Sequence, residues 1–255
     1  MSLDSIYRNG IQRVWTEDYD SQCKYTDLVR QTRNMQGIDF KKINAFFIPN
    51  DNYVKQYFDI DIVSPEYGFY NRENQCFWNN CLVIPIYNVA DRIISVVGFN
   101  PFKYLQAKET KDWSLNYYIY ASSRVFKKGS FMFYLEGCYR RALDDGYLFI
   151  TDGIFDTVSV QLAGFNAAAL MGSTVTPEIA AMLRFVPRLI FAGDNDEAGL
   201  KLAQDLKKVH PRITMLRQGK TKDIDDLLKS EYRESVIRQL SEARDCNASF
   251  FTLEV

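Results

Sequence analysis

The sequence lacks a long apolar run. No stretch of its 255 residues approaches the roughly 18 to 20 consecutive apolar residues that a membrane-spanning helix needs. The first residues, Met1 to Arg8, also lack the apolar segment of a secretory signal peptide. We therefore expect a cytoplasmic protein that has no membrane partner.

Zinc-binding side chains are scarce. The sequence has one histidine, His210, and five scattered cysteines. Cys76 and Cys81 are the only close pair, and no second pair is present to complete a tetrahedral site. These counts predict no zinc in this chain and cysteines that are buried or unreactive.

A basic excess over the whole chain is also absent. The 31 Lys and Arg residues are balanced by 32 Asp and Glu residues, which argues against a uniformly basic surface. From Lys103 to Arg141, however, the sequence has eight basic residues and only three acidic ones. A solvated face is the ordinary interpretation of such a local excess, and a track for a phosphate backbone is the alternative.

Two short apolar segments end at acidic residues and glycine, and each is followed by a helical pattern. Residues 147–151 precede Asp152-Gly153, and residues 188–192 precede the segment Gly193-Asp194-Asn195-Asp196-Glu197-Ala198-Gly199. Continuous apolar runs of this kind are typical of parallel strands that are covered on both faces. The pattern predicts two βα units of an α/β fold.

The acidic residues at these two strand ends are candidate metal ligands. If the strands are neighbours, Asp152, Asp194 and Asp196 meet in the crevice at the carboxyl ends of the sheet. Three carboxylates repel one another unless a hard cation such as Mg²⁺ neutralises them. The alternative is that an Asp-x-Asp segment after a strand caps a helix and lies in a solvated turn.

Other patterns predict the remaining elements. In the first half we expect a helix at 24–36, a β-hairpin over 81–99 and a strand at 116–120. In the second half we expect helices at 130–144, from 152 to about 162, from 177 to about 186, at 197–209 and at 231–244, with strands at 165–170 and 213–216. A change of pattern near residue 145 suggests three parts: 1–145 as a mixed α+β subdomain, 146–230 as an α/β domain and 231–255 as a helical tail.

The acidic motifs resemble those of the Toprim domain, which occurs in bacterial-type primases, type IA and type II topoisomerases and certain nucleases. The matching segments are Asp152-Gly153 and Asp194-Asn195-Asp196-Glu197-Ala198-Gly199. Family members normally carry Glu at the first position. Asp152 keeps that charge on an arm that is shorter by one methylene.

A wider resemblance links residues from about 27 to 228 to the catalytic core of DnaG-type primases. It rests on the order of several modest motifs: 82–86, Gly98-Phe99, 122–129, 164–166, 172–176 and 222–225. It implies a Toprim domain with a mostly parallel sheet flanked by helices, preceded by a mixed α+β subdomain.

The resemblance implies a DNA-dependent RNA primase that joins ribonucleotides on a single-stranded DNA template, with Mg²⁺ or Mn²⁺ bridging the triphosphate. Asp194 and Asp196 are the implied metal ligands, and Asp152 is an implied ligand or acid/base. Asp156, Asp223 and Asp225 are the implied outer ring of the metal site. Helix capping is the alternative role for Asp156.

Several features depart from the family pattern. The family's zinc-binding domain has no match in the sequence, and Cys81, Asn100 and Tyr118 stand where the family has basic residues. The candidates to contact nucleic acid instead are Lys103, Arg124, Lys127 and Lys128. Expected partners are single-stranded DNA, ribonucleoside triphosphates and either a replicative helicase or a separate zinc-binding protein. The alternatives are a non-catalytic nucleic-acid- or partner-binding module and a Toprim nuclease.

Overall fold

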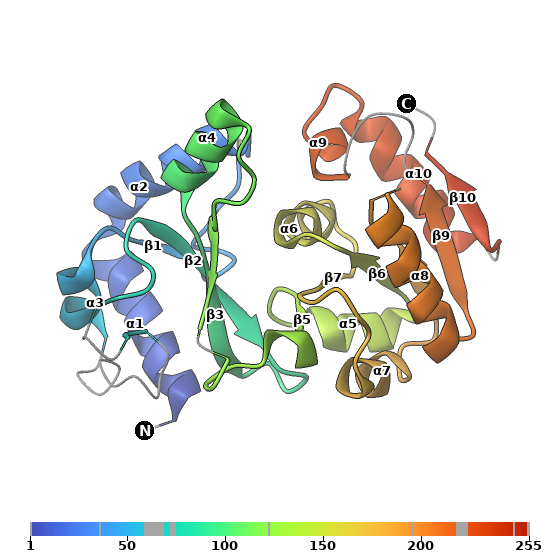
Figure 1. Ribbon diagram of the computed structural model, residues 1–255, viewed down its shortest axis with the longest axis horizontal. Coiled ribbons are helices and arrows are strands. Elements are labelled where there is room, and N and C mark those ends of the chain that lie inside the picture. Colours follow the sequence, from blue (N-terminus) through green and yellow to red (C-terminus); the bar gives the residue numbers. More distant parts are fainter. Residues whose placement is uncertain are drawn as a thin grey trace. The chain divides into compact units, whose positions relative to one another are not determined.

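The computed structural model describes residues 2–35, 37–58, 69–71, 75–121, 123–194, 196–217, 224–246 and 248–253 (Figure 1). The chain divides into two compact units, Met1–Lys127 and Lys128–Val255. Residues 128–145, which the sequence analysis grouped with the first part, thus lie in the second unit. Within the described ranges, no helix is both long enough and apolar enough to cross a membrane.

The first unit is built on an antiparallel sheet with the strand order β1-β2-β3-β4. Its strands are β1 (Phe46–Ile48), β2 (Cys81–Tyr87), β3 (Ile93–Phe99) and β4 (Tyr118–Tyr120). The predicted hairpin is confirmed as β2 and β3, which pair from Leu82↔Phe99 to Tyr87↔Ile93. Its helices are α1 (Leu3–Glu17), α2 (Tyr19–Thr32), α3 (Asp51–Tyr57) and α4 (Pro101–Thr110).

The second unit is built on a sheet with the order β10-β9-β8-β6-β7-β5, in which only β5 runs antiparallel to its neighbour among the described strands. The strands are β5 (Met132–Phe133), β6 (Leu148–Thr151), β7 (Ala167–Leu170), β8 (Leu189–Phe191), β9 (Ile213–Arg217) and β10 (Phe250–Thr252). The helices are α5 (Cys138–Asp145), α6 (Ile154–Leu162), α7 (Pro177–Leu183), α8 (Glu197–Val209), α9 (Ile224–Leu228) and α10 (Arg233–Asp245). The predicted α/β fold class is confirmed.

One face of this second sheet is covered by α6, α9 and α10. Phe149 of β6 and Ile190 of β8 point into a buried apolar cluster with Val160, Leu227 and Leu240 from these helices. The cluster fixes β6 and β8 against α6, α9 and α10, because buried apolar area is the main stabilising term of such a layer.

Two predicted elements of the second unit differ from the structure. The helix expected at 130–144 is wrong in its first half, because residues 132 and 133 form β5 and Gly137, with φ +74°, precedes α5. The tail is helical at α10 as predicted, but it then adds β10, a strand parallel to β9. A three-residue edge strand is defined by its pairing partner, which its own sequence does not reveal.

Candidate metal centre at the ends of β6 and β8

The site lies where the strand order of the second sheet reverses. From β6 the chain passes through α6 to β7 on one side, whereas from β8 it passes through α8 to β9 on the other. β6 and β8 are parallel neighbours, with Leu148 paired to Leu189 and Ile150 paired to Phe191. The condition stated for the acidic residues, that the two strands are neighbours, is therefore met, and ligands of open α/β sheets bind in the crevice at such a reversal.

A hydrogen bond links the two acidic strand ends. The backbone N–H of Asp194 donates to Oδ2 of Asp152 at 2.9 Å, across 42 residues of sequence. Directly before it, the N–H of Ala192 donates to the carbonyl of Ile150 at 2.7 Å. Asp152 and Asp194 are both exposed. Beyond the last backbone hydrogen bond between β6 and β8, the two strand ends are therefore joined by a bond to the Asp152 side chain.

Asp196 is the N-cap of α8. Its Oδ1 accepts a hydrogen bond of 2.8 Å from the N–H of Gly199, in the extended backbone conformation that an N-cap adopts. The capping role that the sequence left open is therefore present. A carboxylate has about four acceptor positions, so this one bond does not prevent Asp196 from binding a cation as well.

The last glycine of the motif is required by close backbone approach. A Cβ atom added to Gly199 would lie 2.0 Å from the carbonyl oxygen of Asp194, a distance that real side chains do not reach. Any larger residue at this position must displace the backbone that carries Asp194. Gly199 thus fixes the distance between the start of α8 and the end of β8.

Gly153, at the end of β6, leaves room for a carboxylate rather than for backbone. A Cβ atom there would lie 1.9 Å from Oδ2 of Asp156, in the first turn of α6. Asp156 is half-buried, and its carboxylate folds back over the helix N-terminus, where the helix dipole favours negative charge. Its Oδ1 also accepts a 3.3 Å hydrogen bond from the N–H of Asp225.

Asp225 is buried rather than open to the crevice. Its side chain is 1% exposed, accepts a hydrogen bond from the hydroxyl of Ser159 on α6 and forms an ion pair with Lys229, the residue that follows α9. These contacts hold α9 against α6. The sequence analysis missed Ser159 and Lys229; the spacing of four residues between Asp225 and Lys229 was the available signal. Asp223, the other predicted member of the outer ring, lies outside the described residues.

Removing the Asp225 carboxylate is expected to destabilise the protein strongly. Asp225→Ala removes one carboxylate from beside Lys229, whose side chain is only 10% exposed, and breaking such a buried pair costs about 3–5 kcal/mol. Asp205→Ala is the matched control, because Asp205 pairs with the exposed Lys208 on α8 and such pairs contribute about 0–1 kcal/mol. Urea unfolding measures both, and equal losses of stability would contradict the role assigned to Asp225.

The donor set suits a hard divalent cation. The side chains of Asp152, Asp194 and Asp196 offer only carboxylate oxygens, which Mg²⁺ and Mn²⁺ prefer. All three are exposed at the carboxyl ends of β6 and β8. Within the described ranges, no three His, Cys, Asp or Glu side chains are gathered in an arrangement ready to hold a metal. The oxygen ligands of these three residues therefore suit the ion. Binding it would require their carboxylates to move closer together than they are in the described structure.

The predicted nucleic-acid contacts are surface residues. Lys103, Arg124 and Lys127 are exposed in the first unit, and Lys128 is exposed at the start of the second. The structure as described does not test whether they bind nucleic acid.

Two of the positions that depart from the basic family pattern form a neutral, packed corner. Cys81 is fully buried and Asn100 is 7% exposed, and both side chains donate to the carbonyl of Asn79. Burial raises the pKa of the Cys81 thiol to about 12, so this cysteine is unreactive at neutral pH, as predicted. Asn100 also caps α4 by accepting a hydrogen bond from the N–H of Lys103. Any binding of phosphates must therefore use other residues.

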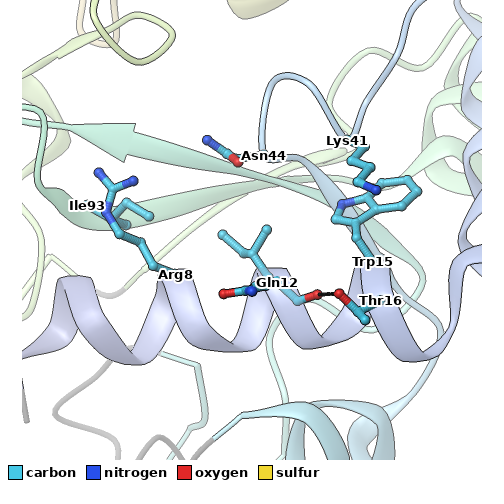
Figure 2. A pocket seen from close by; sticks show the side chains of 8 residues that line it. Arg8, Gln12, Trp15, Thr16, Lys41, Asn44 and Ile93 are labelled. Carbon is cyan, nitrogen blue, oxygen red and sulfur yellow. Dashed lines mark hydrogen bonds between the residues drawn. The ribbon is translucent and has the colours of Figure 1, made fainter.

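A separate cavity of about 290 Å³ lies along α1 in the first unit (Figure 2). Figure 2 shows Arg8 and Ile93 at one end and Lys41 and Trp15 at the other. The guanidinium of Arg8 is held by Asp4 and by the carbonyl of Asp91 at 2.6 Å, which indicates a structural role for this side chain.

The sequence analysis missed α1, although Ile6, Ile11 and Val14 have helical spacing.

Comparisons of sequence point to one group of proteins. Residues 149–228 match the Toprim-like family. The chain is 27% identical over 173 residues to the DNA primase of Thermotoga maritima, covering 64% of this chain and 28% of that protein. It is 26% identical over 215 residues to the DNA primase of Rickettsia bellii, covering 76% of this chain and 34% of that protein. The chain thus spans about a third or less of the length of these relatives.

Comparisons of structure show the same fold over nearly the whole chain. The RNA polymerase domain of the Mycobacterium tuberculosis primase DnaG aligns with a TM-score of 0.69 at 18% identity, covering 94% of this chain and 82% of that one. A DnaG primase catalytic domain bound to single-stranded DNA aligns with a TM-score of 0.70 at 16% identity, covering 94% and 78%. At these identities the likeness establishes the fold.

Proposed function

The chain carries a Toprim domain within the fold of the DnaG-type primase catalytic core, and on that premise we propose that it synthesises RNA primers on single-stranded DNA. The reaction is metal-dependent ribonucleotidyl transfer, in which a 3′-hydroxyl attacks the α-phosphorus of a ribonucleoside triphosphate and pyrophosphate leaves. The substrates and the template are parts of this proposal.

One observation carries the proposal furthest. The carboxylate of Asp152 accepts the N–H of Asp194 where β6 and β8 end side by side, at the reversal of the strand order. This hydrogen bond supports an arrangement in which Asp152, Asp194 and Asp196 serve one crevice. Gly199 supports it too, because it allows a close approach of the start of α8 to the backbone of Asp194.

We assign each acidic residue a role. Asp194 and Asp196 would hold Mg²⁺ or Mn²⁺, with Asp152 as a further ligand that also orients the backbone of Asp194. The bound ion would neutralise charge on the triphosphate and lower the pKa of the attacking hydroxyl. Asp156 and Asp223 belong to an outer ring, and Asp225 is a positioning residue that holds α9 and the N-terminus of α6 together.

The fold favours a primase over a Toprim nuclease. The likeness to primase cores extends over 94% of the chain and therefore includes the first unit as well as the Toprim domain. The neutral corner at Cys81 and Asn100 instead favours the second candidate, a binding module without catalysis, because phosphate neutralisation is lost there. Primer synthesis separates these two readings directly.

The remaining parts of the proposal concern organisation and partners. Lys103, Arg124, Lys127 and Lys128 are proposed to contact the nucleic-acid backbone. The protein is proposed to be cytoplasmic. A replicative helicase or a separate zinc-binding protein is the proposed source of start-site selection.

Incubating the protein with single-stranded DNA, labelled ribonucleoside triphosphates and Mg²⁺ or Mn²⁺ tests the function. We expect slow synthesis of short RNA that stops when EDTA removes the metal. Degradation of the DNA in place of synthesis would favour the nuclease. Binding without any product, with and without a primase zinc-binding domain added in trans, would favour the binding module.

Metal binding is expected to stabilise the fold. Clustered carboxylates repel one another until a cation binds, so Mg²⁺ or Mn²⁺ at 100 times its Kd should add about 2.7 kcal/mol. For a protein of this size the melting temperature should rise by roughly 5–10 °C. Asp194→Asn should shrink this shift, whereas Asp205→Asn on α8 should leave it unchanged. Equal shifts in the two variants would remove the metal site from the proposal.

A further inference from the structure

A connected group of aromatic rings lies at the surface of the first unit, on α4 and the segment that follows it. Tyr104 of α4 packs against Tyr117 at a centroid distance of 5.3 Å and against Trp113 at 6.2 Å. Tyr117 also contacts Tyr118 at 5.2 Å, and the buried Phe99 lies behind them. We call Tyr104, Trp113 and Tyr117 the aromatic surface. Figure 1 shows α4 beside α2.

The backbone holds these rings in place. Lys111 adopts the left-handed conformation, with φ +56°, and so ends α4 and turns the chain back along it. Asp112 closes the next turn, because its Oδ1 accepts hydrogen bonds from the N–H and the hydroxyl of Ser114 at 3.0 and 2.6 Å. The N–H of Asn100 donates to the carbonyl of Tyr117 at 2.9 Å. Trp113 therefore projects from a fixed loop.

The aromatic surface consists of one exposed ring, Trp113, and two half-buried rings, Tyr104 and Tyr117. Trp113 is 57% exposed, whereas Trp15 and Trp78 are 5% and 0% exposed. Phe102 and Leu105, on other faces of α4 than Tyr104, are 51% and 41% exposed. An exposed tryptophan that packs on two half-buried rings is a candidate binding surface, because leaving its ring in water forgoes the stabilisation that burial provides.

The charges around the aromatic surface indicate what binds there. Lys103, Lys108 and Lys111 are exposed on α4 or at its end, and the guanidinium of Arg33 lies 5.0 Å from the ring centre of Tyr104 and donates to its hydroxyl. The acids nearby are Glu109 and Asp112, and Asp112 is engaged by Ser114. Arg33 beside Tyr104 and exposed lysines on the same helix are complementary to a polyanion that carries flat, apolar groups.

We propose that the aromatic surface stacks on the unpaired bases of single-stranded nucleic acid while Lys103, Lys108 and Lys111 contact its phosphates. Every base has an apolar face, so aromatic stacking of this kind is tolerant of sequence, and basic residues beside the rings follow the backbone. A duplex keeps its bases stacked inside and cannot use these rings. The identity of the strand as a primase template rests on the proposed function. The binding of single strands by this surface does not depend on it.

Tryptophan fluorescence gives a direct test. Because Trp113 is the exposed tryptophan of the three, a single-stranded oligo-dT should quench the emission of the intact protein through this residue. Trp113→Ala should weaken binding about 10- to 100-fold, as expected for the loss of one stacked base. Trp113→Phe should keep most of the affinity and lose the quenching. Phe185→Ala, at a 71% exposed ring in the second unit, is the control and should bind as the wild type does.

An abasic oligonucleotide of the same length separates stacking from charge. This oligonucleotide keeps the phosphates but has no bases to stack. The wild type should therefore bind it more weakly than oligo-dT, and Trp113→Ala should bind it with the same affinity as the wild type. An unchanged affinity of Trp113→Ala for oligo-dT would overturn the proposal. Analytical ultracentrifugation tests a second way in which the proposal could fail. If Trp113→Ala loses self-association but binds DNA as before, the surface joins two copies of this chain and the proposal is overturned.

The two proposals fail in different ways. If the protein makes primers while Trp113→Ala binds single strands as the wild type does, only the stacking surface is wrong. If Trp113→Ala loses binding but the wild type makes no RNA under any metal condition, the surface stands and the primase activity is refuted.

Discussion

Combining Asp194→Asn with Asp196→Asn is expected to reduce primer synthesis by on the order of a thousandfold or more. A catalytic metal contributes several kcal/mol of charge stabilisation, and each 1.36 kcal/mol is a factor of ten in rate. The double variant removes two of the three charges that we assign to the ion. Primer extension under saturating Mg²⁺ measures the loss.

Asparagine is the right replacement because it separates the two roles of Asp196. Its side-chain oxygen can still accept the N–H of Gly199 and cap α8, so the fold should keep its stability. Asp196→Ala should instead lose about 1 kcal/mol of stability in addition to activity. The backbone N–H of Asp194 that donates to Asp152 is unchanged in either variant. Primer synthesis that survives the double substitution would refute the mechanism.

Gly199→Ala is expected to cost about a hundredfold in rate although it removes no functional group. The new Cβ would lie 2.0 Å from the carbonyl oxygen of Asp194, so the segment that carries Asp194 must move. A misplacement of about 1 Å in a catalytic group costs on the order of 10²-fold. The apparent affinity for Mn²⁺ should fall in parallel, because the same displacement separates the carboxylates.

Gly129→Ala is the matched control for this substitution. A Cβ atom there would meet no atom within 4 Å, so rate and metal affinity should stay close to the wild type. Circular dichroism and urea unfolding establish that both alanine variants remain folded. If Gly199→Ala keeps full activity, the close approach of α8 to the end of β8 does not position the site.

The sequence predicted the second sheet well because its strands are short apolar segments with acidic or glycine ends. Those signals located β6 and β8, the helix α8 with its N-cap, and the acidic residues between them. The strands β5 and β10 escaped prediction, since each has only two or three residues and exists by pairing with a neighbour. Local patterns therefore revealed the centre of the sheet and not its edges.

Local patterns in the sequence suggested the candidate site residues but not the contacts between them. The hydrogen bond from Asp194 to Asp152 depends on the register between two strands about 40 residues apart, which no local pattern specifies. The burial of Asp225 depends on Ser159, which lies 66 residues earlier in the chain. Asp196 shows the reverse case: its capping role was readable from the sequence because the partner is three residues away.

The central claim is that Asp152, Asp194 and Asp196 share one divalent ion at the ends of β6 and β8. Anomalous diffraction from crystals soaked in Mn²⁺ tests it most directly, because the signal locates the metal itself. We predict a peak about 2.1–2.2 Å from carboxylate oxygens of Asp194 and Asp196, with Asp152 bound directly or through water. Crystals that bind Mn²⁺ elsewhere, or that show no peak in this crevice at millimolar Mn²⁺, would contradict it.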